Sequence, residues 1–581
     1  MNRWTLAVMA LTSLGAVPPA PQYDVTGLWG ATLDSGPYAR GAASIDGRAN
    51  EWRALIAGYD VPVTRDGSRV RWSLPGDAGS FDGSVQRDGT IAGTWIQPPT
   101  RLSGDRYATP VRFRRGAART WFADVRPLAD QATVYLDVTR TSDGSMHAFL
   151  RNPEANIGRG RSFLVTVDGT RILFANANDK GDTISGRLDP KSNTFVAFVD
   201  PVGTMTFSRR GRNDAVGFYP RTVAGAWSYH EPVPLGDGWR VGTIQSAGVS
   251  VRPIASMINT ILNTPTVSAR SPYVQSLLLA RHGRLVLDEY FYGFDPWRTH
   301  DLRSAGKSFT GLMLGIAIDR RSPISLHETA LEAFPQYPSV ANEDARKRRI
   351  TIEDLISMRS GLSCDDNDEN SPGNEDRMYA QTAQPDYYRY ALDLPMSTSP
   401  GEPTAVYCTA GINVVGGAIR TATRTSLIDF FARYVAQPLQ ISDYHLNLAP
   451  NGDAYAGGGA YLRPRDALKL GQLYLNRGIW NGHRIVSASW IDRSVKQHSA
   501  FAASAYAPSH GYGYAWHLFT VASAGHTYAE YMAQGNGGQL IAVLPDLDAV
   551  VGFTAGNYNN FPVWRRFFED DIPKFIIPSL R

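Results

Sequence analysis

The feature that most constrains the fold is an internal repeat in the first third of the chain. Its best-matched pair of segments reads VTRDGSRVRW and VTVDGTRILF, and two shorter matches follow in the same order. The matched segments are 63–72 with 165–174, 81–85 with 184–188, and 111–115 with 205–210. Asp-Gly between two alternating runs is a strong hairpin signal, and both copies carry it. The repeat predicts a duplicated antiparallel β-unit, closed as a barrel or stacked as a sandwich.

The chain of 581 residues is too long for one hydrophobic core and predicts several domains. Residues 22–212 have the texture of an all-β domain, and residues 213–238, rich in Pro, Gly and aromatics, form a linker. From residue 239 to 581 the pattern is mixed. Strand-like runs flank turns at 281–284 and 545–548, and apolar residues recur at helical spacing from Phe309. Strands at both ends with helices between them predict an α+β domain.

The N-terminus predicts export. Arg3 precedes an apolar run from Trp4 to Val17, which prolines then interrupt, so residues 1–21 have the pattern of a signal peptide cleaved between Ala16 and Gln22. The run is too short to span a bilayer, no later segment is long enough, and no cysteine follows it to carry a lipid anchor. The expected location is the periplasm or the extracellular medium.

Two cysteines and a balanced charge narrow the class further. In an oxidising compartment Cys364 and Cys408 allow one intramolecular disulfide, although two separate thiols are the alternative. The net charge is +4 with both signs interspersed, and without a basic stripe we expect no nucleic-acid partner. The oligomeric state stays open.

The segment Arg303-Ser304-Ala305-Gly306-Lys307-Ser308 admits two chemistries. A phosphate-binding loop would need glycine where Asp301 stands, and a carboxylate there would repel phosphate. A Ser-x-x-Lys pair instead places Lys307 beside the hydroxyl of Ser304 near the start of a helix. A lysine among apolar neighbours loses its proton more easily and can act as a base for a serine nucleophile. A small-residue face, which includes Gly311 and Gly315, leaves room for close packing or for a substrate.

Further segments follow this motif in a consistent order. They are residues 300–304 (HDLRS), 351–362 (TIEDLISMRSGL), 407–413 (YCTAGIN), 457–466 (GGGAYLRPRD) and 533–539 (AQGNGGQ). Together they make residues 239–581 resemble the serine β-lactamase and penicillin-binding-protein superfamily, especially its class C-like branch of esterases and 6-aminohexanoate-oligomer hydrolases. The fold class implied is an all-β N-terminal domain followed by an α+β β-lactamase/transpeptidase-like domain.

The resemblance implies a set of site residues. Ser304 would be the nucleophile, Lys307 its base, and Tyr407 either a phenolate held by Lys307 or a proton shuttle to the leaving group. The backbone N–H groups of Ser304 and Asn536 would form the oxyanion hole. The implied substrate-binding residues are Thr409, Gln534, Gly535 and Gly537. No metal or organic cofactor is needed.

Two departures from the family pattern bear on the substrate. Thr409 stands where the family usually has asparagine, and Ala533 stands where β-lactamases usually have a lysine that holds the substrate carboxylate. Ala533 cannot hold that carboxylate and favours a neutral small-molecule ester or amide over a β-lactam. Thr409 has fewer donors than asparagine, which weakens the case for positioning an amide substrate. The alternatives are a β-lactamase or D-Ala-D-Ala carboxypeptidase, and a non-catalytic binding protein on the same scaffold.

An acidic segment at 365–376 follows the Ser-Gly-Leu segment. Three interpretations remain open for it: an exposed acidic loop, a calcium site built from alternating Asp366, Asp368 and Asn370, or attraction of a cationic substrate.

Overall fold

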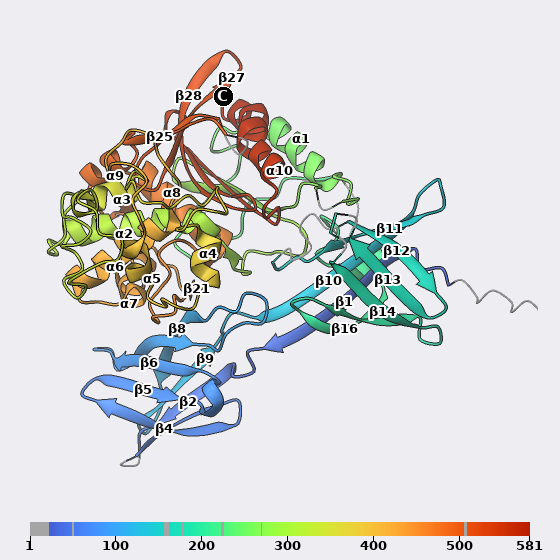
Figure 1. Ribbon diagram of the computed structural model, residues 1–581, viewed down its shortest axis with the longest axis horizontal. Coiled ribbons are helices and arrows are strands. Elements are labelled where there is room, and N and C mark those ends of the chain that lie inside the picture. The colour runs from blue at the N-terminus through green and yellow to red at the C-terminus, as the bar shows by residue number, and fades with distance from the viewer. Residues whose placement is uncertain are drawn as a thin grey trace, which may run out of the picture.

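The computed structural model describes residues 23–48, 51–155, 162–176, 178–179, 181–221, 226–268, 270–504 and 508–581. The predicted signal peptide lies outside these residues. Figure 1 shows two all-β bodies, blue and teal, beside a larger mixed body coloured from green to red. An all-β N-terminal region and a mixed C-terminal domain are therefore confirmed. Within the described ranges, no helix is long and apolar enough to cross a bilayer.

The first barrel consists of consecutive antiparallel strands, and its last strand pairs with both β2 and β8, which closes the ring. Its strands are β2 (Gly41–Asp46), β3 (Trp52–Ile56), β4 (Tyr59–Asp66), β5 (Arg69–Ser73), β6 (Ser80–Val85), β7 (Ile91–Ile96), β8 (Tyr107–Arg115) and β9 (Thr120–Val125). Alternate residues such as Trp72, Phe81, Trp95 and Phe113 fill its interior, as the two-residue period of a strand requires.

The second barrel takes one strand from the start of the chain. β1 (Gly27–Gly36) pairs with both β10 and β16 and closes a ring whose other strands come after the first barrel. They are β10 (Asp130–Arg140), β11 (Met146–Arg151), β12 (Ser162–Asp168), β13 (Arg171–Asn176), β14 (Thr183–Asp189), β15 (Thr194–Val199) and β16 (Gly203–Arg209). Because β1 belongs to the second ring, the first barrel is inserted between two adjacent strands of the second.

The repeated sequence segments occupy equivalent strands in the two rings. The strongest match forms the β4–β5 hairpin in the first barrel and the β12–β13 hairpin in the second. Their registers agree, since Asp66 faces Arg69 and Asp168 faces Arg171. The two shorter matches fall on β6 with β14 and on β8 with β16. The expected hairpins are confirmed, while the duplication itself remains a prediction.

The mixed domain is built on one twisted sheet in the order β17-β19-β18-β30-β29-β28-β27-β26-β25. Its strands are β17 (Arg240–Val241), β18 (Val274–Arg281), β19 (Arg284–Tyr290), β25 (Ser499–Phe501), β26 (His510–Tyr512), β27 (His517–Ser523), β28 (His526–Gly535), β29 (Gln539–Leu544) and β30 (Ala549–Ala555). The sheet thus joins segments far apart in sequence, and both predicted hairpins, at 281–284 and 545–548, lie in it.

Each face of this sheet packs on helices. Leu277 and Leu279 point into one core, which α1 (Val251–Leu262) and η7 (Phe567–Ile576) cover, while Leu278 and Ala280 point into the other. The mixed domain contains further helices. They are α2 (Lys307–Asp319), α3 (Ile352–Ile356), α4 (Glu375–Ala380), α5 (Tyr387–Asp393), α6 (Thr409–Thr423), α7 (Leu427–Phe431), η5 (Ala432–Ala436), α8 (Pro464–Leu475), α9 (Ala488–Ser494), α10 (Phe561–Arg566) and α11 (Ile577–Ser579).

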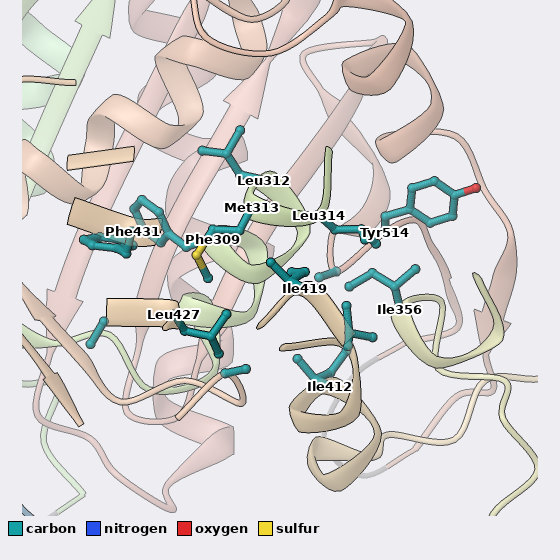
Figure 2. Packing of buried hydrophobic residues seen from close by; sticks show 14 of the residues in the cluster. Phe309, Leu312, Met313, Leu314, Ile356, Ile412, Ile419, Leu427, Phe431 and Tyr514 are labelled. Atoms are coloured by element: carbon teal, nitrogen blue, oxygen red, sulfur yellow. The ribbon is translucent and has the colours of Figure 1, made fainter. Parts of the chain in front are cut away.

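Helix α2 is buried on all sides. Figure 2 shows its apolar residues Phe309, Leu312 and Met313 packed among side chains of neighbouring helices. A Cβ at Gly311 would lie 3.0 Å from the carbonyl oxygen of Tyr514, and one at Gly315 would lie 2.3 Å from the Trp490 ring. The small-residue face predicted from sequence therefore serves close packing.

The first barrel joins the mixed domain through a continuous sheet. β8 pairs with β21 (Tyr444–Asn447), β21 with β22 (Ala460–Leu462), and β22 with β20 (His300–Asp301). In Figure 1, β8 of the blue body lies next to β21 of the mixed body. This ladder ends at Asp301, three residues before Ser304, so the first barrel is connected by backbone hydrogen bonds to the segment that leads into the candidate nucleophile.

Candidate active site

Ser304 lies on a short 3-10 turn, η3 (Arg303–Gly306), that leads directly into α2. The turn is fixed at its start. Leu302 N donates to Ala460 O at 3.0 Å, and Asp301 accepts from Arg303 N at 2.8 Å. Arg303 has φ of +48°, a left-handed conformation that residues other than glycine rarely adopt. The residue before Ser304 thus holds an unfavourable conformation that the Asp301–Arg303 ion pair, also 2.8 Å, helps to maintain.

Lys307 contacts Ser304 directly. Its Nζ donates to Ser304 Oγ at 2.8 Å, and the lysine is 1% exposed. Burial lowers the pKa of Lys307, while the charges of Glu375 and Asp366 oppose the shift. A lowered pKa makes the neutral amine, the form that can accept a proton, available nearer to neutral pH.

Tyr407 borders the same pair of side chains. Lys307 Nζ lies 4.9 Å from the centre of its ring, and its hydroxyl hydrogen-bonds Ser304. Burial raises the pKa of Tyr407 well above the usual value of a phenol. Of the two roles expected for Tyr407, the raised pKa favours a neutral hydroxyl that passes a proton over a standing phenolate.

Cys408 follows Tyr407 in an extended conformation and caps α6, where its sulfur accepts from Gly411 N at 3.2 Å. Its sulfur lies at disulfide-bonding distance from that of Cys364, with the two Cα atoms 5.2 Å apart. The pair connects the segment that carries Tyr407 to the start of the acidic segment.

Thr409, which stands where the family usually has asparagine, directs its hydrogen bonds to another residue of the protein. It is fully buried at the start of α6, and both its N–H and its hydroxyl donate to Asp366, at 2.8 and 2.6 Å. Asp366 lines the cleft. Burial raises the pKa of Asp366 to about 7, with Glu375 adding to the shift and Lys307 opposing it.

The motif at residues 533–539 begins at the end of β28, against the turn that carries Ser304. A Cβ at Gly535 would lie 2.2 Å from Leu302 O and 3.2 Å from Ala305 N, so only glycine fits. The next residue, Asn536, lines the cleft, and its side-chain oxygen accepts from Asn559 N at 2.7 Å. The structure therefore brings the backbone of 535–536 beside that of 304–305, where two N–H donors for one oxyanion are needed.

The other residues of this motif divide between cleft and core. Gln534 lines the cleft, and its amide nitrogen lies 2.9 Å from the sulfur of Met532. Ala533 is buried on β28 and offers no charge to the cleft. Gly537 packs beneath Tyr558, whose ring a Cβ would approach within 2.7 Å, so Gly537 supports the loop instead of facing a substrate.

Two histidines beside Tyr407 escaped sequence reasoning. His517 stacks on the Tyr407 ring at 6.2 Å, and its Nδ1 lies 2.9 Å from His510 Nε2. His510 Nδ1 faces the carbonyl of Pro508 at 2.8 Å. Burial lowers the pKa of both imidazoles, so they are neutral at neutral pH. Their spacing across the β26–β27 turn carries no recognisable sequence motif.

The acidic segment turns partly inward. Asp366 accepts from Glu375 N at 2.9 Å, and Glu375 accepts from the Tyr455 hydroxyl at 2.6 Å. Asp368 caps the exposed turn at Asn370 N. Within the part of the chain that the structure describes, no group of three His, Cys, Asp or Glu side chains is placed to hold a metal ion. The calcium interpretation therefore has no support from the described residues.

One cleft of about 1670 Å³ is bordered by Ser304, Asp366, Glu375, Tyr407, His510, His517, Gln534 and Asn536. The mixed domain supplies Ser304, Tyr407 and Asn536, the first barrel supplies residues around Tyr107, and the second supplies residues around Glu154. A serine with a buried amine, a tyrosine and adjacent backbone donors can perform acyl transfer.

Comparison with known proteins agrees with this arrangement. The family model described as Beta-lactamase matches residues 271–563, and the chain belongs to that family. A 6-aminohexanoate-dimer hydrolase from Paenarthrobacter ureafaciens is 25% identical over 267 residues, which are 43% of this chain and 66% of that protein. This chain thus spans slightly less than two thirds of that relative.

Solved structures with a similar fold include an octameric penicillin-binding protein homologue from Pyrococcus abyssi, with 14% identity, coverage of 56% of this chain and 79% of that one, and a TM-score of 0.43. Another is EstCE1, a hydrolase with promiscuous acyltransferase activity, with 16% identity, coverage of 56% and 98%, and a TM-score of 0.42. At these values the two structures add nothing to the family assignment.

Proposed function

We propose that the protein is an exported serine hydrolase that cleaves an ester or amide through an acyl-enzyme on Ser304. The observation that carries the proposal is the 2.8 Å contact between Lys307 Nζ and Ser304 Oγ, buried beside Tyr407. Membership in the Beta-lactamase family supports it, because that family pairs such a serine and lysine.

In the proposed reaction, neutral Lys307 takes the proton of Ser304 as the hydroxyl oxygen attacks the substrate carbonyl. The N–H groups of Ser304 and Asn536 hold the negative oxygen of the tetrahedral intermediate. Tyr407 gives its proton to the leaving alkoxide or amine and regains one from the Lys307 ammonium. The same groups then activate water, which releases the acyl group and restores Ser304.

The substrate is proposed to lack the carboxylate of a β-lactam or a D-Ala-D-Ala terminus. Ala533 is buried and uncharged, and the hydroxyl of Thr409 is occupied by Asp366. A carboxylate entering this cleft would meet Asp366 and Glu375 without the lysine that β-lactamases usually place at position 533. The relative named for 6-aminohexanoate dimers supports an amide as one substrate class.

A fluorophosphonate probe tests whether the site is catalytic. We expect covalent labelling of the native protein, no labelling of Ser304→Ala, and hydrolysis of short nitrophenyl esters or amides in a substrate panel. Absence of labelling, or equal labelling of both proteins, would favour a non-catalytic binding protein. Cephalosporin hydrolysis far faster than ester hydrolysis would favour the β-lactamase alternative.

The proposal also covers how the chain is divided into domains. We propose a signal peptide at 1–21, an all-β domain at 22–212 that arose by duplication, a linker at 213–238 and the hydrolase domain at 239–581. The common hairpin register of β4–β5 and β12–β13 supports duplication. Export is supported by the bonding distance between Cys364 and Cys408, which suits an oxidising compartment.

A further inference from the structure

The loop before β8 brings the first barrel to the candidate active site. Tyr107 opens β8 and pairs with Asn447 at the end of β21. Two residues further along β8, Thr109 Oγ1 lies 2.8 Å from His445 Nδ1, and both residues are buried. The ring of Tyr107 also packs edge-on against Tyr461, at 5.4 Å. These contacts fix the loop at residues 100–107, the barrel wall of the cleft, against the hydrolase domain.

Gly458 and Gly459 lie between the turn that carries Ser304 and Asn447, which contacts the barrel wall. A Cβ at Gly458 would lie 3.2 Å from Ser304 N, and a Cβ at Gly459 would lie 3.0 Å from the side chain of Asn447. Asn447 Nδ2 in turn donates to Asp105 Oδ2 at 3.4 Å. Asp105 and Ser304 line the same cleft, so a substrate bound at Ser304 that extends toward the barrel approaches Asp105.

Asp105 and Asn447 carry polar side chains where the barrel wall meets the hydrolase domain. Asn447 is 6% exposed and lines the cleft, its Nδ2 is shared between Asp105 and the Tyr379 hydroxyl, and its buried Oδ1 has no hydrogen-bond partner among the described residues. Burial raises the pKa of Asp105 to about 6, so the carboxylate is largely ionised at neutral pH. Arg303, the neighbouring cation, is already paired with Asp301.

We propose that Asp105 of the first barrel, positioned by the hydrogen bond from Asn447, binds a cationic group of the ester or amide substrate, so that the barrel wall determines specificity. This rests on the proposed function of Ser304. An ammonium has three donors and no acceptor, which suits a carboxylate that lines the cleft. Asp105 touches the substrate away from the scissile bond and selects it without entering the chemistry.

Matched substrates test this assignment. Nitroanilides of ω-amino acids of graded length are compared with isosteres in which a methyl group replaces the ammonium, and a second set carries the cation on the leaving group. We expect the wild-type protein to prefer the cationic member of at least one set in kcat/KM. Asp105→Asn should reduce that preference about tenfold and leave the uncharged isosteres nearly unaffected.

Asp105→Lys provides a second, independent reading, because a positive charge should abolish the preference for cationic substrates or invert it. Asp66→Asn, at an exposed turn of the same barrel, is the matched control and should behave as the wild type. Turnover without a cationic preference, or a preference that Asp105→Asn and Asp105→Lys retain, overturns this inference alone. If the wild-type protein shows neither turnover of any substrate nor probe labelling, the proposed function is wrong and this inference is wrong with it.

Discussion

Two walls of the cleft differ in how they are built. The proposed catalytic wall, comprising Ser304, Lys307, Tyr407 and Asn536, belongs to one domain. Its lysine is buried and its tyrosine is partly buried against the core of that domain. The barrel wall at residues 100–107 belongs to another domain and reaches the site through one strand pairing and a few side-chain contacts.

This difference suggests that the catalytic wall supplies the proton transfer and that the barrel wall selects the substrate. Burial shifts the pKa values of Lys307 and Tyr407, and proton transfer depends on those shifts, so the catalytic wall tolerates little change. Asp105 is half-buried and weakly bonded, which suits a group whose partner is the substrate. We therefore expect substitutions in the catalytic wall to reduce the rate for every substrate, and substitutions in the barrel wall to change the rate for some substrates only.

The largest expected effect follows Ser304→Ala. Without the attacking oxygen, kcat/KM for nitrophenyl esters should fall by about 10⁴-fold or more for every acyl chain tested. Ser308→Ala is the matched control one turn along the chain, since its hydroxyl only donates to Ala515 O, and it should stay within a few-fold of the wild type. A Ser304→Ala protein with a tenth of the original activity would show that this wall is not catalytic.

Tyr407→Phe tests the proton shuttle. Loss of the hydroxyl should lower kcat by about 10²–10⁴-fold, with little change in melting temperature, because the ring still packs against Phe501 and His517. Tyr512→Phe removes a hydroxyl from another buried tyrosine of the same aromatic cluster and serves as the control. Equal activity of the two variants would remove Tyr407 from the mechanism.

The cysteine pair lies next to the catalytic wall, because Cys408 directly follows Tyr407. Replacing Cys364 and Cys408 by serine should lower the free energy of unfolding by about 2–4 kcal/mol, because the crosslink restricts the unfolded chain. Denaturant titration of oxidised wild type and double variant measures the difference, and a mass spectrum under non-reducing conditions checks the bond. Equal stability, or two free thiols in the exported protein, would contradict the bridge.

The smallest effect concerns pH. The negative charge of Asp366 raises the pKa of Lys307, so it opposes the effect of burial and keeps the lysine protonated to higher pH. Asp366→Asn removes that charge, and the acidic limb of kcat/KM against pH should move to lower pH by about one unit or less. Asp368→Asn, on the exposed part of the same segment, should leave the limb in place. A shift to higher pH would reverse the assigned coupling.

Sequence reasoning reached the catalytic wall because its signals are local. Ser304 and Lys307 are three residues apart on one turn. Glycine is required at 535 because two backbone segments approach closely there, and the sequence motif contains this glycine. The β-hairpins of both barrels were predictable for the same reason, since Asp-Gly turns fix the register of adjacent strands.

The barrel wall could not be predicted because it depends on long-range pairing. Asp105 and Asn447 are 342 residues apart, and neither lies in a motif. The mutual position of His510 and His517 depends likewise on the fold of β26 and β27. Thr409 shows the converse limit. The motif at 407–413 predicted that Thr409 contacts the substrate, but its hydroxyl bonds to Asp366. Asp366 belongs to the acidic segment, which that motif does not include.

Trapping the acyl-enzyme tests the central claim most directly. The protein is mixed with an activated ester, quenched in acid within the first turnovers, digested and analysed by mass spectrometry. We predict that the peptide containing Ser304 carries the acyl mass and that the adduct is absent from Ser304→Ala. Steady turnover with no adduct at Ser304, or an adduct that persists in Ser304→Ala, would contradict it.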